Sequence, residues 1–491
     1  MKPIVCVVVF GILGVALIAV GGGLIPVFTN LIHNNVKDKV KIQNGTDTYD
    51  KWLSPPYPVY FQVWAYDVLN PSDIVQGKKP VVAEKGPYTY KEERHKVNVT
   101  FYPNGTVSYR EIRWFTFDRE RSIGSDDDII TTVSVPMVSI VNLIRFQFSF
   151  VKELVNFVLK MAGEPLFMKL SVKQLMWGYE DQLLKDAKEL LEKYVGKIID
   201  DKFGLFMAAN NSDDGMYTIH TGVDDTNKFG IVDNWNGNST LHFWTTDSCN
   251  KINGTDGTVF PPFVDKSDKL FIFSTDICRS IFTSFSKEYE LKGVNVYRFS
   301  APDSVFANYT ANPANTGFCT PKGNCLGSGV LNVSICQPMN APVILSQPHF
   351  HAASPKIKNA IDGIQDTPED VTILDVEPLT GALFKADKKM QMNVFLENVS
   401  HITDMALLDD LIFPIIWLNE STLIDDADVD TFKSEVEKPI KITKGVQYGL
   451  MALGAFVLIC TIIYAVRKGM GKKGEIVLVD IPTERTGLLE S

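Results

Sequence analysis

The hydrophobic positions of this chain are unevenly distributed, and the two densest runs lie near its ends. Residues 4–26 carry no charge, and this run exceeds the roughly 20 residues that a helix needs to cross about 30 Å of hydrocarbon. Residues 448–466 form a second uncharged run, and the basic residues that follow it fit the positive-inside rule. We therefore predict transmembrane helices at 4–27 and 448–466.

The first run has a competing interpretation as a cleavable signal peptide. Such a peptide has an apolar region of about 7–15 residues, followed by a small-x-small cleavage site. The run is longer than this and lacks Ala-x-Ala at its end, so an uncleaved signal anchor is favoured.

Glycosylation sequons orient the chain across the membrane. Ten Asn-x-Ser/Thr sequons lie between the two apolar runs, and neither tail contains one. We therefore expect residues 28–447 to be lumenal and residues 1–3 and 467–491 to be cytosolic. The expected glycosylation sites are Asn44, Asn98, Asn104, Asn210, Asn238, Asn253, Asn308, Asn332, Asn398 and Asn419.

The positions of the seven cysteines are consistent with a lumenal middle region. Cys6 and Cys460 lie in the apolar runs, where a thiol behaves as a small apolar group. An oxidising compartment is expected to pair four of the remaining five and to leave one over, and the spacing alone leaves the pairing open. These five are Cys249, Cys278, Cys319, Cys325 and Cys336.

Between the spans, most of the sequence predicts short β-strands. Segments 97–102 and 107–110 alternate apolar and polar residues and flank the turn PNGT at 103–106. Asn-Gly between alternating runs is a strong hairpin signal. No internal repeat, Gly/Ser linker or long charge run divides the region, which favours one continuous ectodomain.

From residue 150 to 199 the hydrophobic period becomes helical, as in a small bundle. The first helix is apolar around more of its circumference than a one-sided surface helix requires. Two interpretations stay open: burial on two sides, or docking of a partner protein or a lipid on the surplus face. The candidate contact residues are Leu154, Val155, Phe157, Val158 and Met161. A second helical stripe follows at Leu184, Ala187, Leu191, Val195 and Ile198.

Composition and motifs exclude several functional classes. The net charge of −10 argues against a broad nucleic-acid surface, and the apolar spans offer almost no polar residues to line a channel pore. His349 and His351 offer half of a zinc site, but no nearby Cys or carboxylate completes it. Phosphate-binding loops and the esterase motif Gly-x-Ser-x-Gly are missing. We predict a protein that is not an enzyme, holds no metal and needs no cofactor besides its glycans.

Ten short segments together resemble the class B scavenger receptor family over nearly the whole chain. They are PPYPVYFQ at 55–62, DVLNP at 67–71, EKGPYTY at 84–90, WGY at 177–179, INGTDG at 252–257, CRS at 278–280, GFC at 317–319, GNCLGSGVLNVSIC at 323–336, PHF at 348–350 and PLTG at 378–381. The resemblance implies a mainly β fold with additional α-helices. Its ectodomain would be an antiparallel β-barrel with a lipid tunnel, and the helical bundle at 150–199 would form the apex. It also implies the disulfides Cys278–Cys336 and Cys319–Cys325, with Cys249 free.

The chain looks most like the lysosomal members of that family. Its tail carries an acidic dileucine pattern, Glu484 followed by Leu488 and Leu489, which clathrin adaptor complexes read. The resemblance implies a location in the late endosome and lysosome membrane, reached through the ER and Golgi. A cell-surface scavenger receptor for lipoproteins or lipids is the alternative.

The same resemblance implies two kinds of partner. One is the lysosomal hydrolase β-glucocerebrosidase, bound by the apical helices at neutral pH, and the other is lipid, either cholesterol or phospholipid. Histidines in the bundle are the obvious pH sensors, but no histidine lies between His95 and His220, and Ser149 and Leu170 stand where histidines would align. Histidine-driven release is therefore in doubt, and a homodimer stays open.

Overall fold

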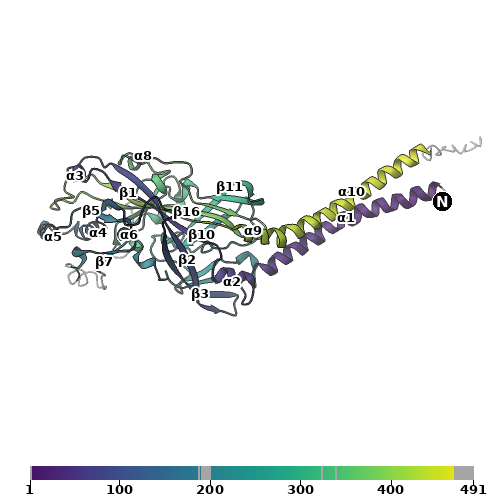
Figure 1. Cartoon of the computed structure of the whole chain (residues 1–491), viewed down its shortest axis with the longest axis horizontal. Coiled ribbons are helices and arrows are strands. Elements are labelled where there is room, and N and C mark those ends of the chain that lie inside the picture. The colour runs from purple at the N-terminus through teal and green to yellow at the C-terminus, as the bar shows by residue number, and fades with distance from the viewer. Residues whose placement is uncertain (1–2, 186–187, 189–200, 322–324, 338–339, 469–491) are drawn as a thin grey trace, which may run out of the picture. The chain divides into compact units, whose positions relative to one another are not determined.

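The computed structural model describes residues 3–185, 188, 201–321, 325–337 and 340–468 (Figure 1). The chain divides into two compact units. One consists of Met1–Asn35 with Asp430–Ser491, and the other of Val36–Val429.

The terminal unit contains α1 (Pro3–Lys39) and α10 (Lys438–Arg467), both longer than the predicted spans. Within the described residues, the helices Ile4–Lys39 and Asp426–Arg467 are the two that are long and apolar enough to cross a membrane. The helices approach closely, because a Cβ added to Gly454 would lie 2.7 Å from the Gly14 carbonyl oxygen.

The second unit is built on a 13-stranded sheet in which all neighbouring strands are antiparallel. Two of its strands, β13 (Val330–Asn332) and β14 (Val343–Ser346), branch from β16. The order of the others is β10 (Lys269–Ser274), β11 (Arg279–Leu291), β12 (Val294–Ser300), β15 (Ile373–Val376), β16 (Leu383–Leu396), β17 (Leu411–Leu423), β1 (Val59–Val68), β2 (Val82–Phe101), β3 (Thr106–Asp118), β8 (Tyr217–His220) and β9 (Val232–Trp235).

A single segment between the outermost strands nearly closes this sheet into a barrel. Thr255 forms bridges with Ile231, next to β9, and with Ile272 of β10. The preceding Gly254 has φ +83°, and a Cβ there would lie 2.0 Å from the Phe271 carbonyl oxygen. Only glycine therefore fits at this seam. The predicted β-barrel and the predicted hairpin, which joins β2 to β3, are confirmed.

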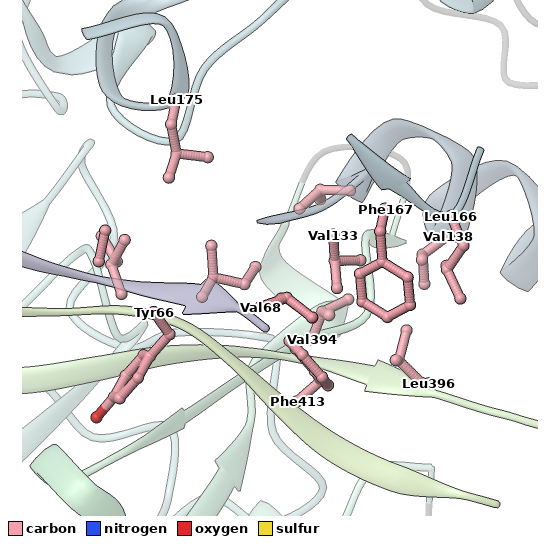
Figure 2. Packing of buried hydrophobic residues seen from close by; sticks show 14 of the residues in the cluster. Tyr66, Val68, Val133, Val138, Leu166, Phe167, Leu175, Val394, Leu396 and Phe413 are labelled. Atoms are coloured by element: carbon pink, nitrogen blue, oxygen red, sulfur yellow. The ribbon is translucent and has the colours of Figure 1, made fainter. Parts of the chain in front are cut away.

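A mixed layer covers one part of the barrel, and it differs from the predicted bundle at 150–199. The layer starts earlier in the chain than the predicted bundle, and a pair of strands interrupts its helices. Residues 186–187 and 189–200 of the predicted bundle lie outside the described residues, and these include Ala187, Leu191, Val195 and Ile198. Figure 2 shows Phe167 of this layer packing near Phe413 of β17, with ring centroids 5.7 Å apart. The layer consists of β4 (Ile129–Val133), α4 (Val135–Ile144), α5 (Ser149–Ala162), β5 (Phe167–Ser171) and α6 (Val172–Trp177).

Short elements make the remaining connections. They are α2 (Asp47–Leu53), α3 (Pro71–Ile74), β6 (Tyr179–Glu180), β7 (Lys202–Phe203), α8 (Pro355–Lys358) and α9 (Asp426–Phe432), with 3₁₀ turns at Met207–Ala209, Thr226–Lys228, Asp303–Val305, Pro313–Phe318, Ser334–Cys336 and Pro348–Phe350, and a π-helical turn at Lys433–Glu437.

Candidate functional site

Helix α5 contacts the rest of the molecule along one narrow face. Leu159 is its one residue with a fully buried side chain, and Val155 packs against the same core from a half-buried position. The helix ends at Gly163, which adopts the left-handed conformation and donates its backbone N–H to the carbonyls of Leu159 and Lys160. Among the described residues, the opposite face of the helix has no contact with the core.

That opposite face and the loop before it form an exposed apolar patch, here named the α5 surface. Phe148 and Phe150 stack within it at a centroid distance of 6.1 Å. A large exposed apolar patch marks an interaction site in a folded protein. The members and their exposed fractions are Phe146 (87%), Phe148 (75%), Phe150 (67%), Leu154 (60%), Phe157 (61%) and Met161 (73%), with Val158 (37%) at the edge.

The structure contradicts one of the two interpretations of this helix, and docking of a partner stays a prediction. Burial on two sides is wrong, because Leu154, Phe157 and Met161 are exposed. Val155 is also removed from the predicted contacts, since it packs inward. The periodicity missed Phe146 and Phe148, which precede the first helical turn and so contribute nothing to a helical stripe.

A histidine does lie next to α5, although it comes from the far end of the sequence. His401, in the segment between β16 and β17, places Nδ1 3.1 Å from Glu153 Oε1. Beside it, Thr403 donates its backbone N–H to Asn156 Oδ1 at 2.9 Å. The sequence analysis therefore missed a histidine beside the helix, because the contact is long-range and the sequence gives no signal for it.

The enclosed side of the barrel carries a group of charges that the sequence analysis also missed. Alternate residues of β2 are exposed, whereas Glu92 and Arg94 point inward with side chains 1% and 9% exposed. Arg94 Nη2 lies 2.8 Å from an oxygen of Glu92 and 2.8 Å from one of Glu420, and Lys96 Nζ lies 2.6 Å from Glu111 Oε2. We name Glu92, Arg94, Lys96, Glu111, Arg113, Lys388 and Glu420 the interior ionic cluster.

Burial affects the carboxylates of this cluster unequally. It raises the pKa of Glu92 to about 7, and the attraction of Arg94 only partly opposes the rise. Burial acts in the same direction on Glu111, but Lys96 and Arg94 outweigh it and lower that pKa to about 2. The pKa of Glu420 is lowered too, by Arg94 and Lys388 against burial. Glu92 therefore takes up a proton as the pH falls from neutral to acidic.

His349 forms a further polar site with two carboxylates. Its Nε2 lies 2.6 Å from Glu84 Oε2 and its Nδ1 lies 2.8 Å from Asp370 Oδ2. Burial alone lowers its pKa, but the hydrogen bonds to Asp370 and Glu84 raise it to about 9. The expectation that no carboxylate lies near this histidine is wrong. An imidazolium that donates both N–H groups has no lone pair left for a metal ion.

The predicted disulfide pairing is confirmed. Cys278 and Cys336 are bonded at 2.02 Å, Cys319 and Cys325 at 1.99 Å, and Cys249 is free and buried.

The sequon asparagines differ in exposure. Seven are exposed, and Asn308 and Asn332 are half-buried. Asn419 is 8% exposed inside β17, with its Nδ2 3.5 Å from Gln62 Oε1. A glycan has no room there, so we remove Asn419 from the expected glycosylation sites. The tail residues Glu484, Leu488 and Leu489 lie outside the described residues, and the sorting signal stays a prediction.

Comparisons with known proteins agree with this architecture. The model of the CD36 family matches residues 12–465. The chain is 38% identical to lysosome membrane protein 2 of Homo sapiens over 433 residues, which is 88% of this chain and 88% of that protein. It is 35% identical to scavenger receptor class B member 1 of Sus scrofa over 460 residues, which is 93% of this chain and 89% of that protein. The chain belongs to the CD36 family of class B scavenger receptors, with lysosomal and scavenger-receptor relatives.

Proposed function

We propose that this protein is a lysosomal membrane receptor that binds β-glucocerebrosidase through the α5 surface and delivers it to lysosomes. The observation that carries the proposal is the exposed aromatic α5 surface on a chain related to lysosome membrane proteins. The role is that of a receptor and not of an enzyme.

The composition of the α5 surface suits a protein partner. Binding energy at protein interfaces is concentrated in a few large side chains near the centre of the contact, and aromatic residues are enriched there. Phe148, Phe150 and Phe157 supply such anchors. Lys152 and Glu153 lie beside them and give the rim the charges that orient a partner.

His401 lies at the edge of the α5 surface, where its Nδ1 is 3.1 Å from Glu153 Oε1. This long-range contact puts a histidine beside the proposed docking surface, although no histidine lies between His95 and His220 in the sequence.

We further propose that the barrel handles lipid, cholesterol or phospholipid, along a tunnel through its interior. Family membership and the nearly closed sheet support this proposal. Side chains of the interior ionic cluster are buried on the enclosed side of the sheet, so a lipid that passes beside them meets paired charges. Binding of a photoactivatable cholesterol to the full chain, competed by unlabelled cholesterol, tests it.

Targeting depends on the two ends of the chain, which we place in the cytosol. The tail pattern of Glu484, Leu488 and Leu489 supplies a carboxylate and two aliphatic side chains to clathrin adaptors. Leu488→Ala with Leu489→Ala is expected to move the protein from lysosomes, which it reaches through the ER and Golgi, to the cell surface. Unchanged lysosomal staining of that variant would contradict the signal.

The similarity to scavenger receptor class B member 1 favours a second candidate, a cell-surface receptor for lipoproteins or lipids. Steady-state location of the untagged protein separates the two candidates, because both share the fold.

The deciding experiment is capture of purified β-glucocerebrosidase by the full chain in lipid nanodiscs at pH 7 and pH 5. We expect capture at pH 7 and release at pH 5. Phe157→Ser is expected to weaken capture by about 30-fold or more, the loss typical of an interface hot spot of about 2 kcal/mol.

Val223→Ser is the matched control, because Val223 is an apolar side chain, 49% exposed, on the loop between β8 and β9. This variant is expected to bind as the parent does. Equal capture by both variants would place the contact elsewhere, and no capture at either pH would leave lipid handling as the main function.

A further inference from the structure

A small cavity lies among the loops near the disulfides, and it shares no residue with the α5 surface or the interior ionic cluster. Its volume is about 40 Å³. One water needs roughly 10–15 Å³ by the same measure, so the cavity holds a group of a few heavy atoms. The lining residues are Arg279, Val305, Phe306, Ala307, Asn308, Tyr309, Asn315, Phe318, Cys319, Cys325, Leu326, Leu331 and Asn332.

Arg279 supplies the charge that lines this cavity. The residue begins β11 and is 5% exposed. Its Nε donates to the Ser280 carbonyl at 3.3 Å and its Nη1 to the Val305 carbonyl at 3.3 Å, while the guanidinium carbon lies 3.6 Å from the Phe318 ring centroid. These neutral contacts hold the guanidinium against the cavity wall without neutralising it.

Within the described part of the chain, Arg279 has no ion-pair partner: no carboxylate oxygen lies within 4.0 Å of its guanidinium. The Cys249 thiol is a further neighbour, and it donates to the Ala314 carbonyl at 3.4 Å. Burial of the unpaired cation lowers the pKa of Arg279 to about 10. Buried charges in proteins are normally paired.

The asparagine side chains that line the cavity already donate hydrogen bonds to backbone carbonyls. Asn308 Nδ2 donates to the Leu326 carbonyl at 2.6 Å, and Asn315 Nδ2 donates to carbonyls that include that of Ala307 at 2.7 Å. Among the described residues, the Nη2 group of Arg279 donates to no acceptor. The guanidinium therefore retains N–H groups for a ligand that accepts hydrogen bonds.

We propose that this cavity binds a small oxyanion, such as a short carboxylate, on the guanidinium of Arg279. The planar guanidinium matches the two oxygens of a carboxylate, and the remaining wall, with Phe306 and Leu331, accepts a methyl-sized apolar group. The volume suits a group of a few heavy atoms and leaves no room for an acyl chain inside the cavity.

The test is the thermal midpoint of the full chain in nanodiscs as acetate replaces gluconate at constant ionic strength. Gluconate carries the same carboxylate on a body too large for the cavity. We expect a saturable rise in midpoint with acetate. Arg279→Met is expected to abolish the rise, and Arg279→Lys to raise the half-saturating concentration by about tenfold.

Two further variants make the outcome decisive. Arg110→Met removes an arginine that is paired with Asp213 away from the cavity, and it is expected to keep the acetate response. Ala307→Leu fills the cavity while leaving Arg279 in place, so it is expected to lose the response even if Arg279→Met fails to fold. An acetate response retained in Ala307→Leu, no saturable response in the parent chain, or a response to chloride but not to acetate would each overturn the proposal.

Discussion

Replacing Glu92 by glutamine is expected to flatten the pH dependence of the stability of the ectodomain between neutral and lysosomal pH. The folded state raises the pKa of Glu92 to about 7 from an ordinary value of 4.5. Between these two values the folded chain binds a proton that the unfolded chain does not, so stability rises as the pH falls. At 1.36 kcal/mol for each pH unit, the gain is roughly 3 kcal/mol in the free energy of unfolding.

Neighbouring groups of the interior ionic cluster do not interfere in this window. The lowered pKa values of Glu111 and Glu420 lie below 4.5, so both carboxylates stay ionised in the folded chain from pH 4.5 to 7, and in the unfolded chain they take up protons only near the lower end of this window. Other carboxyls with raised pKa, such as that of Asp214, contribute with the same sign as Glu92. The informative quantity is consequently the difference between the parent chain and Glu92→Gln.

The assay is unfolding of both proteins in nanodiscs at closely spaced pH values from 4.5 to 7.5. The parent is expected to gain roughly 3 kcal/mol more than Glu92→Gln across this range. Glu111→Gln is the matched control: it breaks the ion pair with Lys96 but keeps the Glu92 carboxyl, so it is expected to lower stability and to keep most of the pH dependence. Parallel pH profiles for the parent and Glu92→Gln would refute the reasoning.

Three further predictions concern other sites. His349→Gln is expected to cost roughly 3 kcal/mol below pH 6.5, because the folded pKa is about 9, and the cost should disappear as the pH rises through 9; unfolding at pH 5 and pH 9.5 measures it. Gly254→Ala is expected to reduce the yield of folded protein strongly, since the new Cβ collides with the Phe271 carbonyl and opens the barrel seam; Gly45→Ala, in open space at a positive φ, controls for backbone strain. His401→Gln is expected to weaken β-glucocerebrosidase capture at pH 7 less than Phe157→Ser does, because His401 contacts only the edge of the α5 surface; an equal loss would contradict it.

The parts of the fold that depend on local sequence could be predicted. Apolar runs predict the cores of α1 and α10, although both helices continue beyond the expected spans into residues of mixed polarity. The Asn-Gly turn predicts the β2–β3 hairpin, where Gly105 has φ +72°. Closure of the barrel could not be derived from periodicity, because it depends on one bridging residue, Thr255, between strands that are distant in sequence.

The candidate sites were harder to predict because their contacts are long-range. The stripe on α5 predicts an apolar helix, but the single buried position at Leu159 shows that its apolar face is turned largely to solvent. The alternating charges of β2 resemble an exposed edge strand in the sequence. The inward-pointing charges of β2 lie inside the barrel because neighbouring strands supply opposite charges. Glu420 of β17 pairs with Arg94, and Glu111 of β3 pairs with Lys96.

Two buried titratable groups stabilise the scaffold in acid, and they lie apart from the proposed docking surface. Glu92 and His349 are buried, and their raised pKa values favour the folded state in acid, so a fall in pH strengthens the scaffold. The α5 surface is exposed and includes neither residue. Variants of the scaffold and of the α5 surface are therefore expected to combine additively: Glu92→Gln changes stability alone, and Phe157→Ser changes binding alone.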